Sequence, residues 1–202
     1  MLTRRDYLKY SALFGAACAL PGGFLNAFEG KNLITRAIPR SGEKLPIVGL
    51  GSSATFRKVA QSDDISALKG VMQTLLDNGG TVFDTAPSYG ASEEVAGQIA
   101  RDAGTTEKIF WATKVNVAPR GGNRADEDKA RAQLARSFQY IGKDPIDLVQ
   151  VHNLADLPTQ MPIIQELKED GKIRYIGTTV TRTSRYGEEP WNVPADATKK
   201  AG

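Results

Sequence analysis

The sequence is poor in cysteine, in histidine and in net charge, and each shortage limits what the protein can be. Its single cysteine, Cys18, lies near the amino end, so a chain cleaved after it would have no thiol and no disulfide. Its single histidine is His152, and we predict no metal site. The net charge of +3 on 202 residues is too small to indicate nucleic-acid binding.

Long apolar runs are also missing. The weakly apolar stretch 10–20 is too short to cross a bilayer, because a spanning helix needs about 20 apolar residues. The composition, 41% hydrophobic and 24% charged, is typical of a soluble globular protein. The length suffices for one sizeable core.

The amino end carries a targeting pattern. Residues Thr3–Lys9 read T-R-R-D-Y-L-K, and small residues follow the apolar stretch, with possible cleavage after Ala19 or Ala27. This resembles a twin-arginine export signal and predicts a periplasmic protein without a membrane anchor after cleavage. An uncleaved amphipathic helix is the alternative, and the protein would then stay in the cytoplasm. A lipoprotein signal at Cys18 is disfavoured because Gly15 stands where such signals usually have leucine.

The rest of the chain alternates between strand and helix patterns. A hairpin is expected over 33–48, with its turn at Ser41-Gly42. Helices are expected over 63–78, after Ser92, over 126–141 and around 163–167, and strands over 47–50, 81–83, 108–114, 146–152 and 173–177. Such alternation predicts parallel strands with right-handed crossovers. We therefore divide the chain into a leader, 1–30, a folded domain, 31–181, and a disordered tail, 182–202.

Two parallel architectures compete, a doubly wound sheet and a (β/α)8 barrel. Gly49-Leu50-Gly51-Ser52-Ser53-Ala54 matches a dinucleotide-binding pattern, but about eight polar residues separate it from the expected helix at 63. Asp84, Lys114 and His152 each end an expected strand, and reactive residues at strand ends are typical of barrels. The barrel is favoured, with the hairpin covering its amino-terminal mouth.

The resemblance to one family rests on four motifs. F-D-T-A-P-S-Y-G-A-S-E-E at 83–94, A-T-K-V at 112–115, D-L-V-Q-V-H-N at 147–153 and E-L-K-E-D-G-K-I-R-Y-I-G at 166–177 stand in the order seen in aldo-keto reductases. The resemblance extends over roughly residues 33–181. It implies an incomplete (β/α)8 TIM-type barrel with about five core parallel strands, and an oxidoreductase.

The resemblance also implies roles for individual residues. The reaction would be NADPH-dependent reduction of a small aldehyde or ketone, with Tyr89 as proton donor. Lys114 would make proton loss from Tyr89 easier, Asp84 would hold Lys114, and His152 would orient the carbonyl oxygen. Each of the four, taken alone, could be structural. The expected cofactor-binding residues are Gly51, Ser52, Asp84 and Thr179.

Three departures from the family pattern keep an alternative open. Thr179 and Val180 stand where the family commonly has a Ser-Asn pair. The chain has 202 residues, whereas eight βα units need about 250. Residues 182–202 also have no equivalent of the segment that holds the adenosine phosphate in the family. The chain resembles a barrel cut short. It is either an active reductase or a catalytically inactive remnant, or it serves as an interaction module that self-associates through an open sheet edge. The sequence does not name the substrate.

Overall fold

The computed structural model describes residues 33–62, 64–118 and 124–180. The predicted twin-arginine leader, Cys18 and the tail 182–202 lie outside the described residues. The fold below belongs to the unit that begins at Thr35. Within the described part, no helix is long and apolar enough to cross a membrane.

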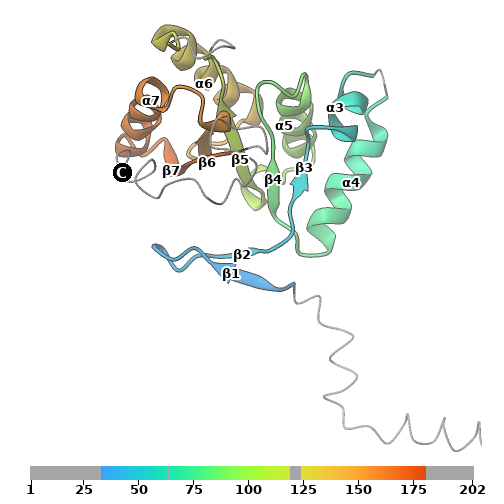
Figure 1. The fold of residues 1–202 in the computed structure, drawn as a ribbon. Coiled ribbons are helices and arrows are strands. Elements are labelled where there is room, and N and C mark those ends of the chain that lie inside the picture. Colours follow the sequence, from blue (N-terminus) through green and yellow to red (C-terminus); the bar gives the residue numbers. More distant parts are fainter. Residues whose placement is uncertain (1–32, 63, 119–123, 181–202) are drawn as a thin grey trace, which may run out of the picture. The chain divides into compact units, whose positions relative to one another are not determined.

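Five parallel strands form the main sheet, in the same order as in the chain (Figure 1). They are β3 (Leu50–Gly51), β4 (Val82–Asp84), β5 (Phe110–Val115), β6 (Ile146–Val151) and β7 (Ile173–Thr178). Within the described residues β3 and β7 are the two edges of this sheet. The predicted set of about five core parallel strands is confirmed, and so is the α/β class.

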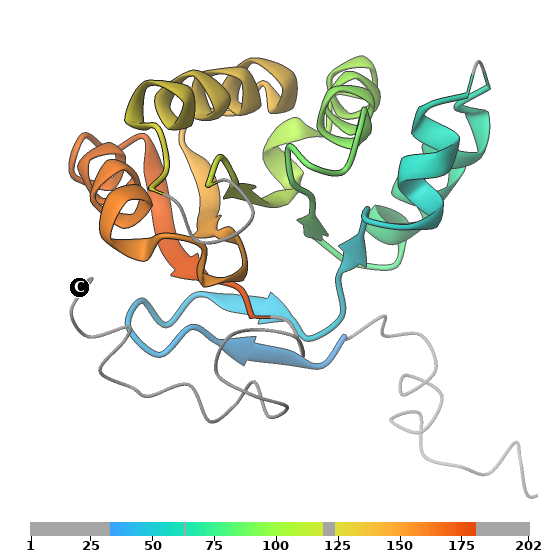
Figure 2. The same ribbon diagram turned by 45° about the horizontal axis from the view of Figure 1, so that its top comes forward.

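Helices join the strands and lie along one side of the sheet, following its arc (Figure 2). The crossover helices are α4 (Ser66–Asp77), α5 (Ser92–Asp102), α6 (Glu127–Ile141) and α7 (Leu157–Glu169). The carboxylate of Asp126 caps α6 by accepting a hydrogen bond from the Lys129 amide, and Gly142 ends that helix with φ at +73°. The boundaries of α6 therefore follow from local sequence signals.

The predicted hairpin is present and is hydrogen-bonded to β7. Strands β1 (Thr35–Ala37) and β2 (Lys44–Pro46) pair antiparallel. The Glu43 carboxylate, in the turn, accepts hydrogen bonds from Arg174 at 2.5 Å and from the Tyr175 hydroxyl at 2.6 Å. Since Arg174 and Tyr175 lie near the start of β7, the hairpin contacts the sheet at its amino-terminal side.

The core lies between the sheet and its helices. Phe83 is fully buried, and its ring centroid lies 5.2 Å from those of Phe56 and Trp111. All six residues of β5 are buried. Successive strand side chains point to opposite faces, and Thr113 bonds to Glu93 of α5 on the helix side. Lys114 therefore points to the face of the sheet that these helices do not cover.

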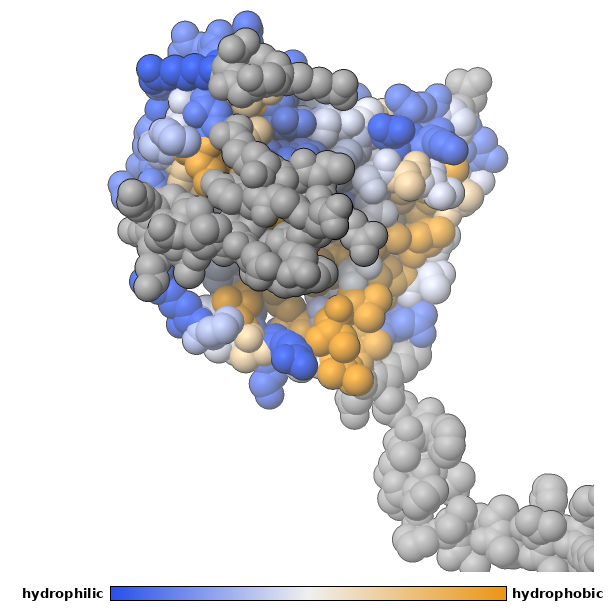
Figure 3. Space-filling model, in the orientation of Figure 1, coloured by the Kyte–Doolittle hydropathy of each residue, from blue (hydrophilic) through white to orange (hydrophobic). Residues whose placement is uncertain are grey.

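Two local predictions were wrong around the first interior strand. The strand expected over 47–50 is reduced to Leu50–Gly51, and Ile47 and Val48 are exposed by 52% and 67%. Apolar side chains, in orange, gather on the lower part of the face shown in Figure 3. An unpredicted helix, α3 (Thr55–Ala60), follows β3 and buries Phe56. Its only two buried residues, Phe56 and Ala60, lie one turn apart. An apolar pattern this short does not distinguish a helix from a polar loop.

The start of the next helix also differs from the prediction. Helix α4 begins at Ser66, three residues after the expected start at 63. The Asp64 carboxylate accepts a hydrogen bond from the Ser66 amide at 2.8 Å, and hydrogen bonds with the side chain and the amide of Ser66 lower the pKa of Asp64. The N-cap residue itself, Ile65, makes no side-chain capping bond.

Candidate active site

Three adjacent parallel strands deliver the predicted catalytic residues to one edge of the sheet. Asp84 is the last residue of β4, Lys114 is the penultimate residue of β5, and His152 follows β6. Tyr89 lies in the loop between β4 and α5. Because the carboxyl ends of parallel strands lie at the same edge, all four residues meet there.

The Lys114 ammonium group is buried and held by three oxygen atoms. Its Nζ donates to both carboxylate oxygens of Asp84 and to the Thr85 carbonyl, each at 2.8 Å. Lys114 is only 3% exposed, whereas the Asp84 side chain is 43% exposed. The carboxylate therefore fixes the ammonium from one side while keeping an open surface of its own.

Tyr89 lies against both Lys114 and His152. The Lys114 Nζ is 5.0 Å from the centroid of the Tyr89 ring. The His152 ring centroid is 5.9 Å from it, with the two rings nearly perpendicular at 82°. Among the described residues, the Tyr89 hydroxyl has no hydrogen-bond partner. The phenol is thus close to a cation and an imidazole.

His152 is half-buried and favours its neutral form. Burial, helped by the positive charge of Lys114, lowers the pKa of His152 below its ordinary value of 6.5, and Asp84 opposes this. Its Nδ1 atom is buried without a hydrogen-bond partner in the described part of the chain. A neutral imidazole can donate one hydrogen bond at this position and adds no second cation beside Lys114.

The residues predicted to bind a cofactor differ in their surroundings. Gly51 lies opposite Asp84 in the sheet register, and a Cβ added to it would meet nothing within 4 Å. Ser52 is fully buried, and its hydroxyl donates to the Asp84 carbonyl at 3.0 Å. The Thr179 hydroxyl accepts a hydrogen bond from the Asn153 amide at 2.8 Å. Gly51 is therefore open to a ligand, while the hydroxyls of Ser52 and Thr179 are engaged with the end of β4 and with Asn153.

The first turn of α5 contains two functional candidates that sequence reasoning missed. Ser92 and Glu93 are buried, with exposed fractions of 0% and 3%. The Glu93 carboxylate accepts from the hydroxyls of Thr113 at 2.5 Å and Ser137 at 3.3 Å. Burial raises the pKa of Glu93, and these two hydrogen bonds oppose the rise. Its spacing of i, i+3, i+4 and i+7 with the small residues Ala96, Gly97 and Ala100 was the available signal.

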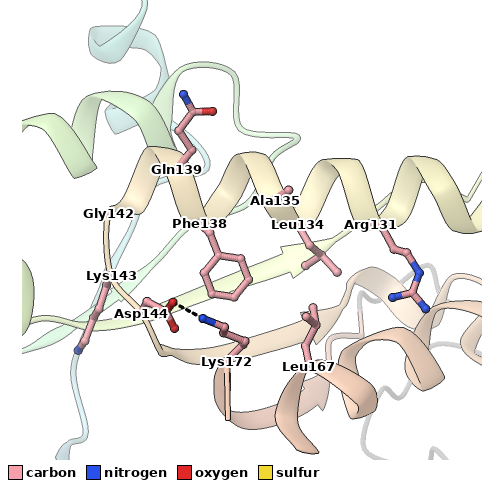
Figure 4. A pocket seen from close by; sticks show the side chains of 10 residues that line it. All are labelled: Arg131, Leu134, Ala135, Phe138, Gln139, Gly142, Lys143, Asp144, Leu167 and Lys172. Atoms are coloured by element: carbon pink, nitrogen blue, oxygen red, sulfur yellow. Dashed lines mark hydrogen bonds and ion pairs between the residues drawn. The ribbon is translucent and has the colours of Figure 1, made fainter. Parts of the chain in front are cut away.

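A hollow elsewhere on the unit is separate from this site. It has a volume of about 460 Å³ and lies between α6 and α7 (Figure 4). Leu134, Phe138 and Leu167 supply its apolar lining, and the Asp144–Lys172 ion pair, 2.6 Å long, lies beside them. None of the four predicted catalytic residues lines it.

Comparison with known proteins decides the family. The profile of the Aldo/keto reductase family matches residues 47–192. The chain belongs to the aldo/keto reductase family. The resemblance stated from the four motifs is thereby confirmed at the level of the family.

Individual relatives of this aldo/keto reductase chain agree. It is 36% identical to "Aldo-keto reductase str7" of Strobilurus tenacellus over 134 residues, which is 65% of this chain and 39% of that protein. It is 30% identical to "Aldo-keto reductase yakc [NADP(+)]" of Schizosaccharomyces pombe over 145 residues, which is 67% of this chain and 42% of that protein. The chain thus spans about two fifths of the length of these curated relatives.

A solved structure gives the same answer for the fold. The crystal structure of PA4992, "the putative aldo-keto reductase" from Pseudomonas aeruginosa, superimposes with a TM-score of 0.61 at 27% identity, covering 73% of this chain and 60% of the other. The predicted fold class is therefore confirmed. The described residues form five strands of a family barrel that they do not close.

Proposed function

We propose that this chain reduces a small aldehyde or ketone with NADPH, and that Tyr89 donates the proton. The observation that carries the proposal is the convergence of Asp84, Tyr89, Lys114 and His152 at one edge of the sheet. Membership of the aldo/keto reductase family supports the reaction class. The name of the Schizosaccharomyces pombe relative supports the cofactor, since it carries NADP(+).

The chemistry asked of Tyr89 follows from the charge that develops on the substrate. When a carbonyl carbon accepts a hydride, its oxygen becomes negative and needs a proton. The Tyr89 hydroxyl is available to donate that proton. The Lys114 ammonium, 5.0 Å from the ring centroid, stabilises the phenolate that remains. Asp84 keeps the ammonium in place by accepting its hydrogen bonds.

His152 orients the carbonyl group. Its lowered pKa keeps the imidazole neutral at pH 7, so it can donate a hydrogen bond to the substrate oxygen without competing with Tyr89 as an acid. Its ring centroid lies 5.9 Å from that of Tyr89, so the two rings are neighbours at this edge of the sheet. Two donors aimed at the same oxygen favour the charge that builds up on it.

The described residues fit the nicotinamide end of the cofactor. NADPH, when bound, supplies the hydride. Asp84 offers a 43% exposed carboxylate to a ribose hydroxyl, and Gly51 leaves open space beside it. The Thr179 hydroxyl, just beyond β7, already accepts a hydrogen bond from the Asn153 backbone amide, and the neighbouring Val180 has no polar side-chain atom, so this side offers the nicotinamide little. The predicted lack of adenosine phosphate contacts concerns 182–202, outside the described residues.

The experiment that tests the proposal removes a single oxygen atom, the hydroxyl of Tyr89. Tyr89→Phe removes the proposed proton donor and keeps the ring over Lys114. We expect kcat for reduction of a small aldehyde, followed by the loss of NADPH absorbance, to fall by about 10²–10⁴-fold. NADPH binding, titrated by fluorescence, should change little. Tyr140→Phe, near the end of α6, is the matched control. Parent-like turnover by Tyr89→Phe would refute the proposal.

A non-catalytic remnant is the second candidate. Val180 in place of a polar residue and the two unpaired sheet edges of the described part favour it. This reading predicts that the purified chain neither binds NADPH nor reduces carbonyls. It also allows self-association through an open edge, which static light scattering would detect as a mass above that of one chain. Tight NADPH binding eliminates it.

A further inference from the structure

The loop that contains Tyr89 is held against the start of α5 by hydrogen bonds of the Ser92 hydroxyl. The Ser92 hydroxyl lies 2.8 Å from the Tyr89 carbonyl and 3.2 Å from the Ser52 carbonyl, so its proton is shared between the two acceptors. Ser52 in turn donates its amide and its hydroxyl to the Asp84 carbonyl, both at 3.0 Å. A buried hydrogen-bonded chain therefore runs from the Tyr89 turn to the strand that carries Asp84.

Glu93, the next residue, reaches in the other direction. One of its carboxylate oxygens accepts from Thr113, which directly precedes Lys114 in β5, and the other accepts from Ser137 in α6. No ion pair involves Glu93 in the part of the chain that the structure describes. A buried acid whose hydrogen bonds come only from hydroxyls is unusual, because burying a carboxyl group is costly, and the positive charges of Lys114 and Arg136 offset only part of that cost.

We infer that the first turn of α5 positions Tyr89 beside Lys114, with Ser92 and Glu93 as its positioning residues. Ser92 holds the Tyr89 turn, and Glu93 holds the strand segment that presents Lys114. Neither residue touches the reacting atoms. The inference rests on the proposed function, since it explains what holds the proposed proton donor, Tyr89, 5.0 Å from the Lys114 ammonium.

The test compares substitutions at two neighbouring glutamates. Glu93→Leu keeps the volume but removes both acceptors, and Glu93→Gln keeps an acceptor for Thr113. Glu94→Leu is the matched control, because Glu94 is exposed on the same turn. Measured quantities are kcat and KM for aldehyde reduction, NADPH affinity by fluorescence, and the ¹³Cζ resonance of Tyr89, assigned with Tyr89→Phe.

We expect Glu93→Leu to lower kcat by about 10–100-fold, because misplacement by about 1 Å can cost 10²-fold. Its ¹³Cζ resonance should move, while NADPH affinity stays within about 3-fold, since a positioning residue acts on the chemical step and not on cofactor binding. Glu93→Gln should retain kcat within about 3-fold and an unmoved resonance, because its side-chain oxygen still accepts from Thr113. Glu94→Leu should match the parent in every quantity.

A second variant covers the case in which Glu93→Leu does not fold. Thr113→Val removes the hydroxyl with nearly the same shape, and it should lower kcat and move the Tyr89 resonance in the same direction. The inference is overturned if kcat and the resonance stay unchanged in Thr113→Val and Glu93→Leu while only the melting temperature falls. It is also overturned if Glu93→Gln is as impaired as Glu93→Leu, because charge and not position would then be responsible.

The two proposals fail separately. Full activity of Tyr89→Phe ends the proposed function, but the ¹³Cζ resonance still reports whether Glu93 holds the ring beside the Lys114 cation, since that measurement needs no turnover. Loss of activity in Tyr89→Phe together with a parent-like Glu93→Leu ends only the positioning role.

Discussion

Gly97→Ala should destabilise the protein even though alanine is the better helix former. Gly97 lies in α5 where that helix meets the last turn of α6. A Cβ at this position would lie 1.9 Å from the Tyr140 carbonyl oxygen and 2.8 Å from its carbon. Ordinary contact begins at 3.4 Å, so the helices must separate by about 1.5 Å. The atoms that would clash with the new Cβ belong to the Tyr140 backbone, so a change of side-chain rotamer cannot remove the clash.

The magnitude follows from two opposing effects. Overpacking in a core costs about 1–3 kcal/mol, and a rigid backbone obstacle places this site at the upper end. Separation of the helices also disturbs the hydrogen bond from Arg101 to the Tyr140 carbonyl, now 2.6 Å long. Alanine returns about 1 kcal/mol through helix propensity. We expect a net loss of roughly 2 kcal/mol in the free energy of unfolding.

Gly70→Ala is the matched control for this prediction. Gly70 is also inside a helix, α4, but a Cβ there would meet nothing within 4 Å. Only helix propensity then acts, and stability should rise by about 0.5–1 kcal/mol. Urea unfolding followed by tryptophan fluorescence measures both changes. If Gly97→Ala stabilises the chain as much as Gly70→Ala does, the described packing of α5 on α6 is wrong.

Two further predictions concern buried charge. Asp147→Ala removes the carboxylate that lies 2.7 Å from the Lys143 ammonium, a group only 9% exposed, so urea unfolding should show a loss of about 3–5 kcal/mol in the free energy of unfolding. Glu166→Gln breaks a half-exposed ion pair and should cause a far smaller loss. Equal losses in the two variants would contradict the burial of the Lys143–Asp147 pair. Burial and the charge of Lys114 lower the pKa of His152 in the folded state. Its contribution to stability is therefore fully present above about pH 6.5 and is lost as the pH falls from there through the lower folded-state pKa. An NMR titration of His152, the only histidine of the chain, should give a midpoint below pH 6.5. Between about pH 7 and pH 5, the free energy of unfolding should fall less in His152→Gln than in the parent. A titration midpoint above pH 6.5 would contradict the lowered pKa.

Much of the fold could be predicted because its signals are local. Helix α6 matched its expected boundaries closely, since a capping aspartate, a regular apolar stripe and a terminal glycine all lie within the segment itself. Strands β4 to β7 were marked by short apolar runs between polar turns. The order of Asp84, Tyr89, Lys114 and His152 along these elements also follows from the sequence.

Other features depend on contacts between distant segments. Helix α3 is defined by the burial of Phe56 against Phe83, and the hairpin is placed by the contact of Glu43 with Arg174. No local pattern contains either pair. A charged residue at a helix start is normally solvated, so the burial of Glu93 could not be read from its own neighbourhood.

Most helices and strands, and the chemical groups that end the strands, follow from residues close along the chain; β3 and α3 are the exceptions. Which groups lie together depends on the packing of distant segments, which binds Lys114 to Asp84 and joins α5 to β5 and α6 through Glu93. These contacts escape a reading of the sequence because burial and hydrogen bonding of a side chain depend on what packs against it, and those partners come from segments far away in the chain.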